Sequence, residues 1–106
     1  MIREKLYKAG TRGHEVLLHE QILLMLGAGL GDVFDVEIGK DKELIYTMGG
    51  SMPFPVARYT MTAGSAKGSV HLGVPPKWLR YHGLKELNFV GVEVKGHRLI
   101  LSKVEE

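Results

Sequence analysis

Apolar and polar residues alternate along several short segments of this chain, and the alternation predicts β-strands. Val70, Leu72 and Val74 are separated by single less apolar residues, which is the pattern of a strand with one buried face. The same alternation, or a short apolar run, predicts further strands at 3–8, 16–18, 33–38, 44–48, 56–61, 89–94 and 99–101. Because these segments are short and separated by turn residues, the chain is predicted to be mainly β.

Two short helices are predicted between these strands. Pro75 and Pro76 end one strand and open a helix over 77–82, because proline suits a first helical turn and has no N–H for a strand ladder. A second helix is predicted near residues 20–26. A glycine follows each helix, where a left-handed C-terminal cap favours a residue without Cβ.

The predicted elements occur twice in the same order. Shifting the chain by 56 residues lays segment 33–38 on segment 89–94 and Gly27 on Gly83. Each half then consists of strand, strand, helix, strand and strand, which favours an internal duplication over chance likeness between two β-rich halves. The predicted boundaries are 1–48 for the first half, 49–55 for the connector and 56–106 for the second half.

Length and composition limit the class of protein. The 106 residues allow one compact domain, and a hydrophobic fraction of 44% supports a folded core. The absence of Cys excludes a disulfide scaffold and a thiolate metal site. No apolar run approaches the roughly 18 residues of a spanning helix, and the charged N-terminus lacks the apolar stretch of a signal peptide. We therefore expect a cytoplasmic protein without a membrane partner.

Charge is distributed in alternating blocks, although the net charge is only +2. The balances are +3 for residues 1–14, −5 for 15–48, +5 for 49–85 and −1 for 86–106. This alternation of basic and acidic blocks agrees with a duplicated sequence. It also predicts that basic side chains of the two halves gather on one part of the surface.

Two segments resemble the AbrB/SpoVT-type swapped-hairpin DNA-binding family. Segment 26–38 (LGAGLGDVFDVEI) is similar to the family core LGLxxGDxVxVxV, and segment 74–85 (VPPKWLRYHGLK) is similar to its IPxxLRxxLGLK segment. The sequence departs from the family pattern in the second half, where Leu87 and Asn88 replace the Gly-Asp pair. The resemblance implies a swapped-hairpin β-barrel with two short helices. In this arrangement a tandem ββαββ repeat forms an intrachain pseudo-dimer. A half of roughly 50 residues buries too little apolar surface to fold alone, so a fused pair is physically reasonable.

The resemblance also implies sequence-specific binding of double-stranded DNA, as in a transcriptional regulator. The basic face is expected to form from the first strands and loops of both halves, with candidate DNA-binding residues Arg3, Lys5, Lys8, Arg12, Arg58 and Lys67. Basic side chains contact phosphates, and an arginine can form a bidentate pair with guanine. The acidic hairpins are expected to lie away from this face. An ordinary solvated surface is the alternative interpretation of the charge blocks.

No segment carries a convincing catalytic or cofactor motif. Segment 14–19 (HEVLLH) has one residue too many for a zinc-protease motif and lies on a predicted strand. The glycines of segment 27–31 follow a helix rather than a strand, so turns explain them better than phosphate binding. We therefore predict a protein that is not an enzyme and that holds no cofactor or metal.

Two other classes of protein compete with a DNA-binding regulator. The antidote of a toxin–antitoxin pair is disfavoured, because no long tail follows the last predicted strand. A non-DNA barrel that acts as a protein-interaction or oligomerising adaptor stays open, as do a homodimer, a higher oligomer and a protein partner.

Overall fold

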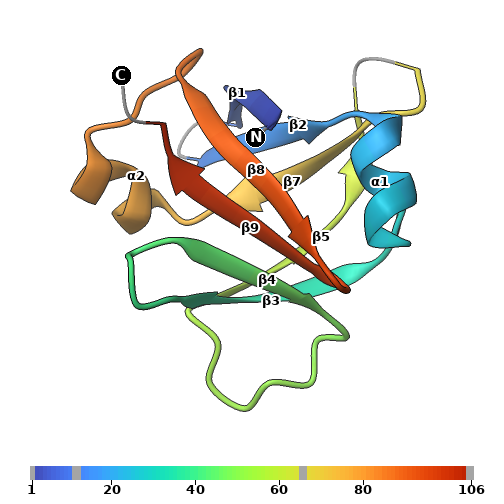
Figure 1. Ribbon diagram of the computed structural model, residues 1–106. Helices are drawn as coiled ribbons and strands as arrows, with labels where there is room; N and C mark the ends of the chain where they lie inside the picture. The colour runs from blue at the N-terminus through green and yellow to red at the C-terminus, as the bar shows by residue number, and fades with distance from the viewer. Residues whose placement is uncertain (1, 11–12, 65–66, 105–106) are drawn as a thin grey trace.

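The computed structural model describes residues 2–10, 13–64 and 67–104. Within these residues, nine strands form one sheet in the order β5-β3-β4-β9-β8-β1-β2-β7-β6, accompanied by two short helices (Figure 1). The elements are β1 (Ile2–Ala9), β2 (Gly13–Leu18), α1 (Glu20–Leu26), β3 (Val33–Ile38), β4 (Leu44–Met48), β5 (Ala57–Thr60), β6 (Thr62–Ala63), β7 (Val70–Val74), α2 (Pro76–His82), β8 (Phe89–Lys95) and β9 (Arg98–Lys103).

The sheet curves into a nearly closed barrel because its first and last strands are neighbours in the chain. β5 and β6 are separated only by Met61, yet β5 pairs with β3 and β6 pairs with β7. Met61 itself points into the core and is 1% exposed. One stretch of chain therefore borders both ends of the sheet, which leaves little unpaired strand edge.

Strands from the two halves of the chain alternate in the sheet. β1 pairs with β8, β3 with β5, β4 with β9 and β2 with β7, always in antiparallel orientation. The hairpins β1–β2, β3–β4 and β8–β9 are the local pairings between these long-range ladders. The described strands of the two predicted halves therefore share one sheet and one hydrophobic core.

The core forms from the inward-facing residues of the strands together with one face of each helix. Ile22, Leu23 and Leu26 of α1 are buried, as are Trp78 and Leu79 of α2. The two helices lie on opposite sides of the barrel (Figure 1). Both end in a left-handed glycine, with φ of 71° at the first and 67° at the second.

Tyr46 connects opposite walls of the barrel through its side chain. The residue is fully buried on β4, and its hydroxyl donates a hydrogen bond of 2.7 Å to the carbonyl of Gly73 on β7. Burial raises the pKa of Tyr46 well above its ordinary value, so the neutral hydroxyl is the form that the core holds. A paired hydroxyl avoids the free-energy cost of an unsatisfied polar group in the core.

The prediction of a mainly β chain with two short helices is confirmed. Strands 33–38, 44–48 and 70–74 and helix 20–26 have the predicted bounds, and residues 49–56 lie between β4 and β5. The predicted strand 56–61 is observed as β5 over 57–60, and after a break at Met61 a short strand, β6, follows that was not predicted. The N–H of Met61 donates to the carbonyl of Asp32, and its carbonyl accepts from Gly31, so the turn before β3 replaces a strand partner there.

Gly73 is predicted to be essential for packing where β5 approaches β7. A Cβ at this position would overlap the ring of Tyr59 close to its attachment point, which a small ring movement does not relieve. Gly73→Ala should therefore lower the free energy of unfolding by about 1–3 kcal/mol in urea denaturation. Gly29→Ala is the matched control, because a Cβ there meets nothing within 4 Å, and it should change stability by less than about 0.5 kcal/mol. Equal stability of the two variants would contradict this packing.

Candidate nucleic-acid interface

The layer formed by β1, β2, β7 and β6 places two of the candidate basic residues at its opposite ends. Lys8 pairs with His14 at one end of β2, beside the turn from β1 to β2. Lys67 is exposed and precedes β7, at the end where Leu18 pairs with Val70. The β2–β7 ladder between these ends spans four residue steps, or about 13 Å. The two lysines therefore flank the β2–β7 pair.

Arg3 and Lys5 occupy alternate, exposed positions of β1 next to β8. Lys5 pairs with Phe89, and its Nζ lies 5.4 Å from the centre of the Phe89 ring, within the range of a cation–π contact. Arg3 pairs with Gly91, which has no side chain. Because side chains alternate along a strand, Arg3 and Lys5 lie on the face of β1 opposite the buried Leu6, whereas Lys8 lies two positions after Leu6, at the exposed end of the strand.

Arg58 differs from the expectation of a free cation. Its Nε donates to Oδ1 of Asp35, and its second guanidinium nitrogen donates to the carbonyl of Met52 over 2.8 Å. The N–H of Met52 donates in turn to Oδ2 of Asp35, also over 2.8 Å. Asp35 is 2% exposed, so Arg58 neutralises a buried carboxylate and ties the connector to β3. Arg58 thus lies with an acidic residue of the β3–β4 hairpin, and the structure does not place it beside Lys8. Arg12, the remaining candidate, lies outside the described residues.

The Arg58–Asp35 pair sets the ionisation of the carboxyl group. The hydrogen bond from Arg58 lowers the pKa of Asp35 below its ordinary 3.8; burial acts in the opposite direction, and the Met52 N–H adds to the lowering. Asp35 is therefore ionised in the folded protein throughout the neutral range.

The face of the β2–β7 ladder opposite Val16 and Leu72 carries a contact between a glutamate and a histidine that the sequence did not predict. His71 Nδ1 lies 2.7 Å from Oε1 of Glu15, and each side chain is 19% exposed. The two residues are diagonal neighbours, because Glu15 pairs with Gly73 while His71 pairs with Leu17. The 56-residue shift that relates the halves also relates Glu15 to His71, and this was the available signal. A carboxylate therefore lies within the β2–β7 ladder, on the face opposite Val16 and Leu72.

A second partly buried pair lies at the start of β1. Glu4 is 7% exposed, and its Oε2 lies 2.9 Å from Nδ1 of His19. His19 and His71 each contact one carboxylate. Within residues 2–10, 13–64 and 67–104 no three His, Asp or Glu residues are grouped as a metal site would need.

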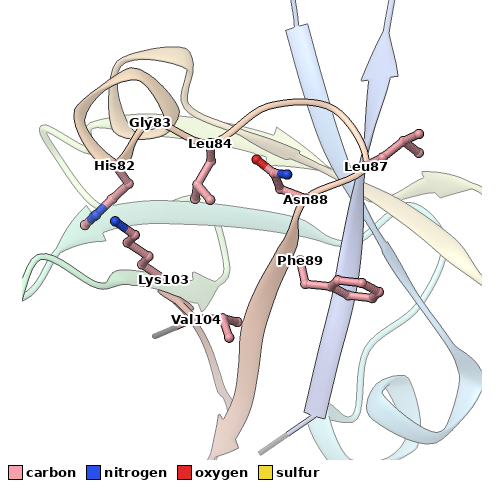
Figure 2. A pocket seen from close by; sticks show the side chains of 8 residues that line it. All are labelled: His82, Gly83, Leu84, Leu87, Asn88, Phe89, Lys103 and Val104. Carbon is pink, nitrogen blue, oxygen red and sulfur yellow. The ribbon is translucent and has the colours of Figure 1, made fainter. Parts of the chain in front are cut away.

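A cavity of about 470 Å³ opens between α2, β8 and the end of β9. Figure 2 shows the side chains of His82 and Lys103 extending towards the same end of it, with Asn88 and Phe89 on the β8 side. Leu87 adopts a left-handed backbone with φ of 70°, which is uncommon for a residue with a side chain. The cavity is open and partly basic, and its lining residues bring no carboxylate or hydroxyl nucleophile together.

Comparison of the chain with protein-family models, with curated proteins and with solved structures finds no match. None of the helices in the described part of the chain is long and apolar enough to cross a membrane.

Acid should weaken the contribution of Asp35 to stability. Because the pKa of Asp35 is lower when folded than when unfolded, its contribution is complete above about pH 4 and is lost as the pH falls through the lower, folded-state value. The difference in unfolding free energy between wild type and Asp35→Asn should therefore be constant near neutral pH and shrink below pH 4, measured by urea denaturation. Asp41→Asn, an exposed acid in the β3–β4 turn, is the control and should show little difference at any pH. A wild-type advantage that persists unchanged in acid would contradict the role of the Asp35 charge.

Proposed function

We propose that the protein is a sequence-specific double-stranded DNA-binding protein, acting as a transcriptional regulator of the AbrB/SpoVT type. The DNA would lie against the exposed ends of the layer formed by β1, β2, β7 and β6. The observation that carries this proposal is the position of Lys8 and Lys67 at the two ends of the β2–β7 ladder. The ladder that they flank is about 13 Å long, comparable to a DNA groove about 12 Å wide, so we propose that both lysines approach phosphates at once.

The proposal includes a swapped-hairpin barrel built from a tandem repeat. Support comes from the register of the long-range ladders, in which Val16 pairs with Leu72 and Ile45 pairs with Ile100. Each of these residues is thus opposite its own counterpart in the other half, at shifts of 56 and 55 residues. A twofold axis that relates the halves would pass through these two pairs.

The turns before β3 and β8 support the same relation. Asp32 Oδ2 accepts from the N–H of Gly29, and Asn88 Oδ1 accepts from the N–H of Lys85, each over 2.8 Å. The carbonyls of Asp32 and Asn88 each accept from the N–H of a buried residue in the leading strand region of the opposite half. Counterparts 56 residues apart therefore make the same bonds, even though Leu87 and Asn88 depart from the Gly-Asp pattern.

The proposed DNA contacts divide into two kinds. Lys8 and Lys67 at the hairpin turns, with Arg3 and Lys5 along β1, would bind phosphates and position the barrel. Arg12, which lies outside the described residues and is predicted near the start of the second strand, would be available for a base edge. Arg58 would support the connector, because its charge is already compensated by Asp35.

Removing the two flanking lysines should weaken DNA binding. In fluorescence anisotropy with a labelled duplex, Lys8→Ala combined with Lys67→Ala should lower affinity at low salt and reduce the slope of log affinity against log salt by about 1 per lysine. Lys95→Ala is the matched control, because this lysine belongs to the β8–β9 hairpin and pairs with Glu93 at 3.9 Å.

Two outcomes would contradict the proposal of DNA binding. One is wild-type protein that fails to bind duplex DNA at low salt, or binds it without any dependence on salt. The other is a double variant that keeps the wild-type affinity and slope. A titration against random-sequence competitor DNA tests the separate claim of sequence specificity.

A non-DNA protein-interaction or oligomerising adaptor barrel is the second candidate function. Phe54, in the connector, is 95% exposed although the neighbouring Met52 is fixed by Asp35 and Arg58. A large aromatic side chain held on an anchored loop is typical of an interface anchor. Phe54→Ser should then reduce the mass of any oligomer measured by sedimentation velocity, while DNA binding stays unchanged. A wild-type monomer at all concentrations would remove the support for self-association.

A further inference from the structure

A second cavity, of about 340 Å³, lies between α2 and the turn that joins β3 to β4. It is lined by Ile38, Lys42, Lys77, Trp78 and Tyr81. Its two walls are fixed to each other, because Trp78 Nε1 donates a hydrogen bond of 2.7 Å to the carbonyl of Lys42. His82 Nε2 lies 3.3 Å from the same carbonyl. The cavity is therefore preformed, and its volume falls in the range of small-molecule sites.

The apolar part of the cavity is aromatic and incompletely covered. Trp78 is 3% exposed and its indole N–H is already bonded, so it contributes a small part of its ring to the inner end of the cavity. Tyr81 is 69% exposed and Ile38 is 47% exposed, which leaves large apolar surfaces at the opening. The ring of His82 packs edge-on against both aromatic rings, with centroid distances of 4.7 Å and 4.9 Å, and so fixes the aromatic wall. This arrangement suits a planar, apolar group.

The charged part of the cavity is entirely basic. Lys42 and Lys77 line it from opposite walls, and no acidic residue is among the lining residues. Lys42 has a left-handed backbone with φ of 65°, one of two non-glycine residues with positive φ in the described part of the chain. Such a conformation persists where its surroundings hold it, and here the bonds to its carbonyl do so. The strained turn thus places one lysine opposite the other across an aromatic wall.

We propose that this cavity binds a small ligand that combines a planar apolar ring with an anionic group, such as an aryl carboxylate. The ring would pack against Trp78 and Tyr81, and the anion would lie between Lys42 and Lys77. The helix itself does not require these residues, because their counterparts in α1 at the 56-residue shift are Gln21, Ile22 and Met25. This inference is independent of DNA binding.

The chain contains one tryptophan, so intrinsic fluorescence reports on this cavity directly. Titration with 3-phenylpropionate should give a saturable change in Trp78 emission at millimolar concentrations and should raise the melting temperature of the protein. The uncharged 3-phenylpropionamide, which has the same apolar body, should bind at least about fivefold more weakly.

Variants separate the charged and apolar contributions. Lys42→Asn, which keeps a residue that tolerates the left-handed turn, and Lys77→Gln should each weaken binding of the carboxylate by about fivefold without changing the affinity for the amide. Tyr81→Ala should lower the affinity for both the carboxylate and the amide. Lys40→Gln is the matched control, because it removes a charge from the same turn but does not line the cavity. Circular dichroism establishes that each variant is folded.

Three results would overturn the proposal. Equal affinity for the carboxylate and the amide would exclude an anion site, and the absence of any saturable response to either probe would exclude a ligand site for this class. Trp78 emission that changes with protein concentration in wild type, but not in Phe54→Ser, would show that a second copy of the chain occupies the cavity instead.

Discussion

The structure depends on two pairings between distant parts of the chain, β1 with β8 and β3 with β5. The predicted first half on its own would therefore leave β1 and β3 each with an unpaired edge. The chain segment that carries β5 and β6 then borders both ends of the strand order and brings β7 close to β5. The same constraint places the β1–β2 and β6–β7 turns at opposite ends of one layer. The proposed DNA face is therefore a consequence of barrel closure and not of any single element.

Much of the fold could be predicted from local signals. Alternating apolar residues located β3, β4 and β7 at their observed bounds, and Pro76 with Gly83 located α2. The interruption at Met61 could not be predicted in this way, because it depends on hydrogen bonds to Gly31 and Asp32, far away in sequence. The period of apolar residues indicates which side chains are buried, but it does not indicate which backbone N–H and carbonyl groups form hydrogen bonds with each other.

The candidate site was predicted less completely than the fold, and for a similar reason. In the charge sums, Arg58 belongs to block 49–85, which contains no acidic residue. The β3–β5 ladder nevertheless places Arg58 beside Asp35 of the preceding block. Glu15 belongs to the acidic block 15–48, but the β2–β7 ladder places it beside His71 of the following basic block. Charge sums along the chain treat each residue as solvated, whereas long-range strand pairing decides which charges are compensated. Lys8 and Lys67, at hairpin turns, were easier to place because turns are local.

The Glu15–His71 pair has a consequence for symmetry. Two identical chains arranged about the same axis would bring glutamate towards glutamate or histidine towards histidine, and neither arrangement gives an attractive pair. A single chain that encodes both sides separately can hold opposite residues at equivalent positions. Dimeric regulators with strict twofold symmetry match palindromic operators, because each half meets the same bases. A barrel whose two sides differ in chemistry does not require a palindromic site. The DNA target of the proposed regulator therefore need not be palindromic.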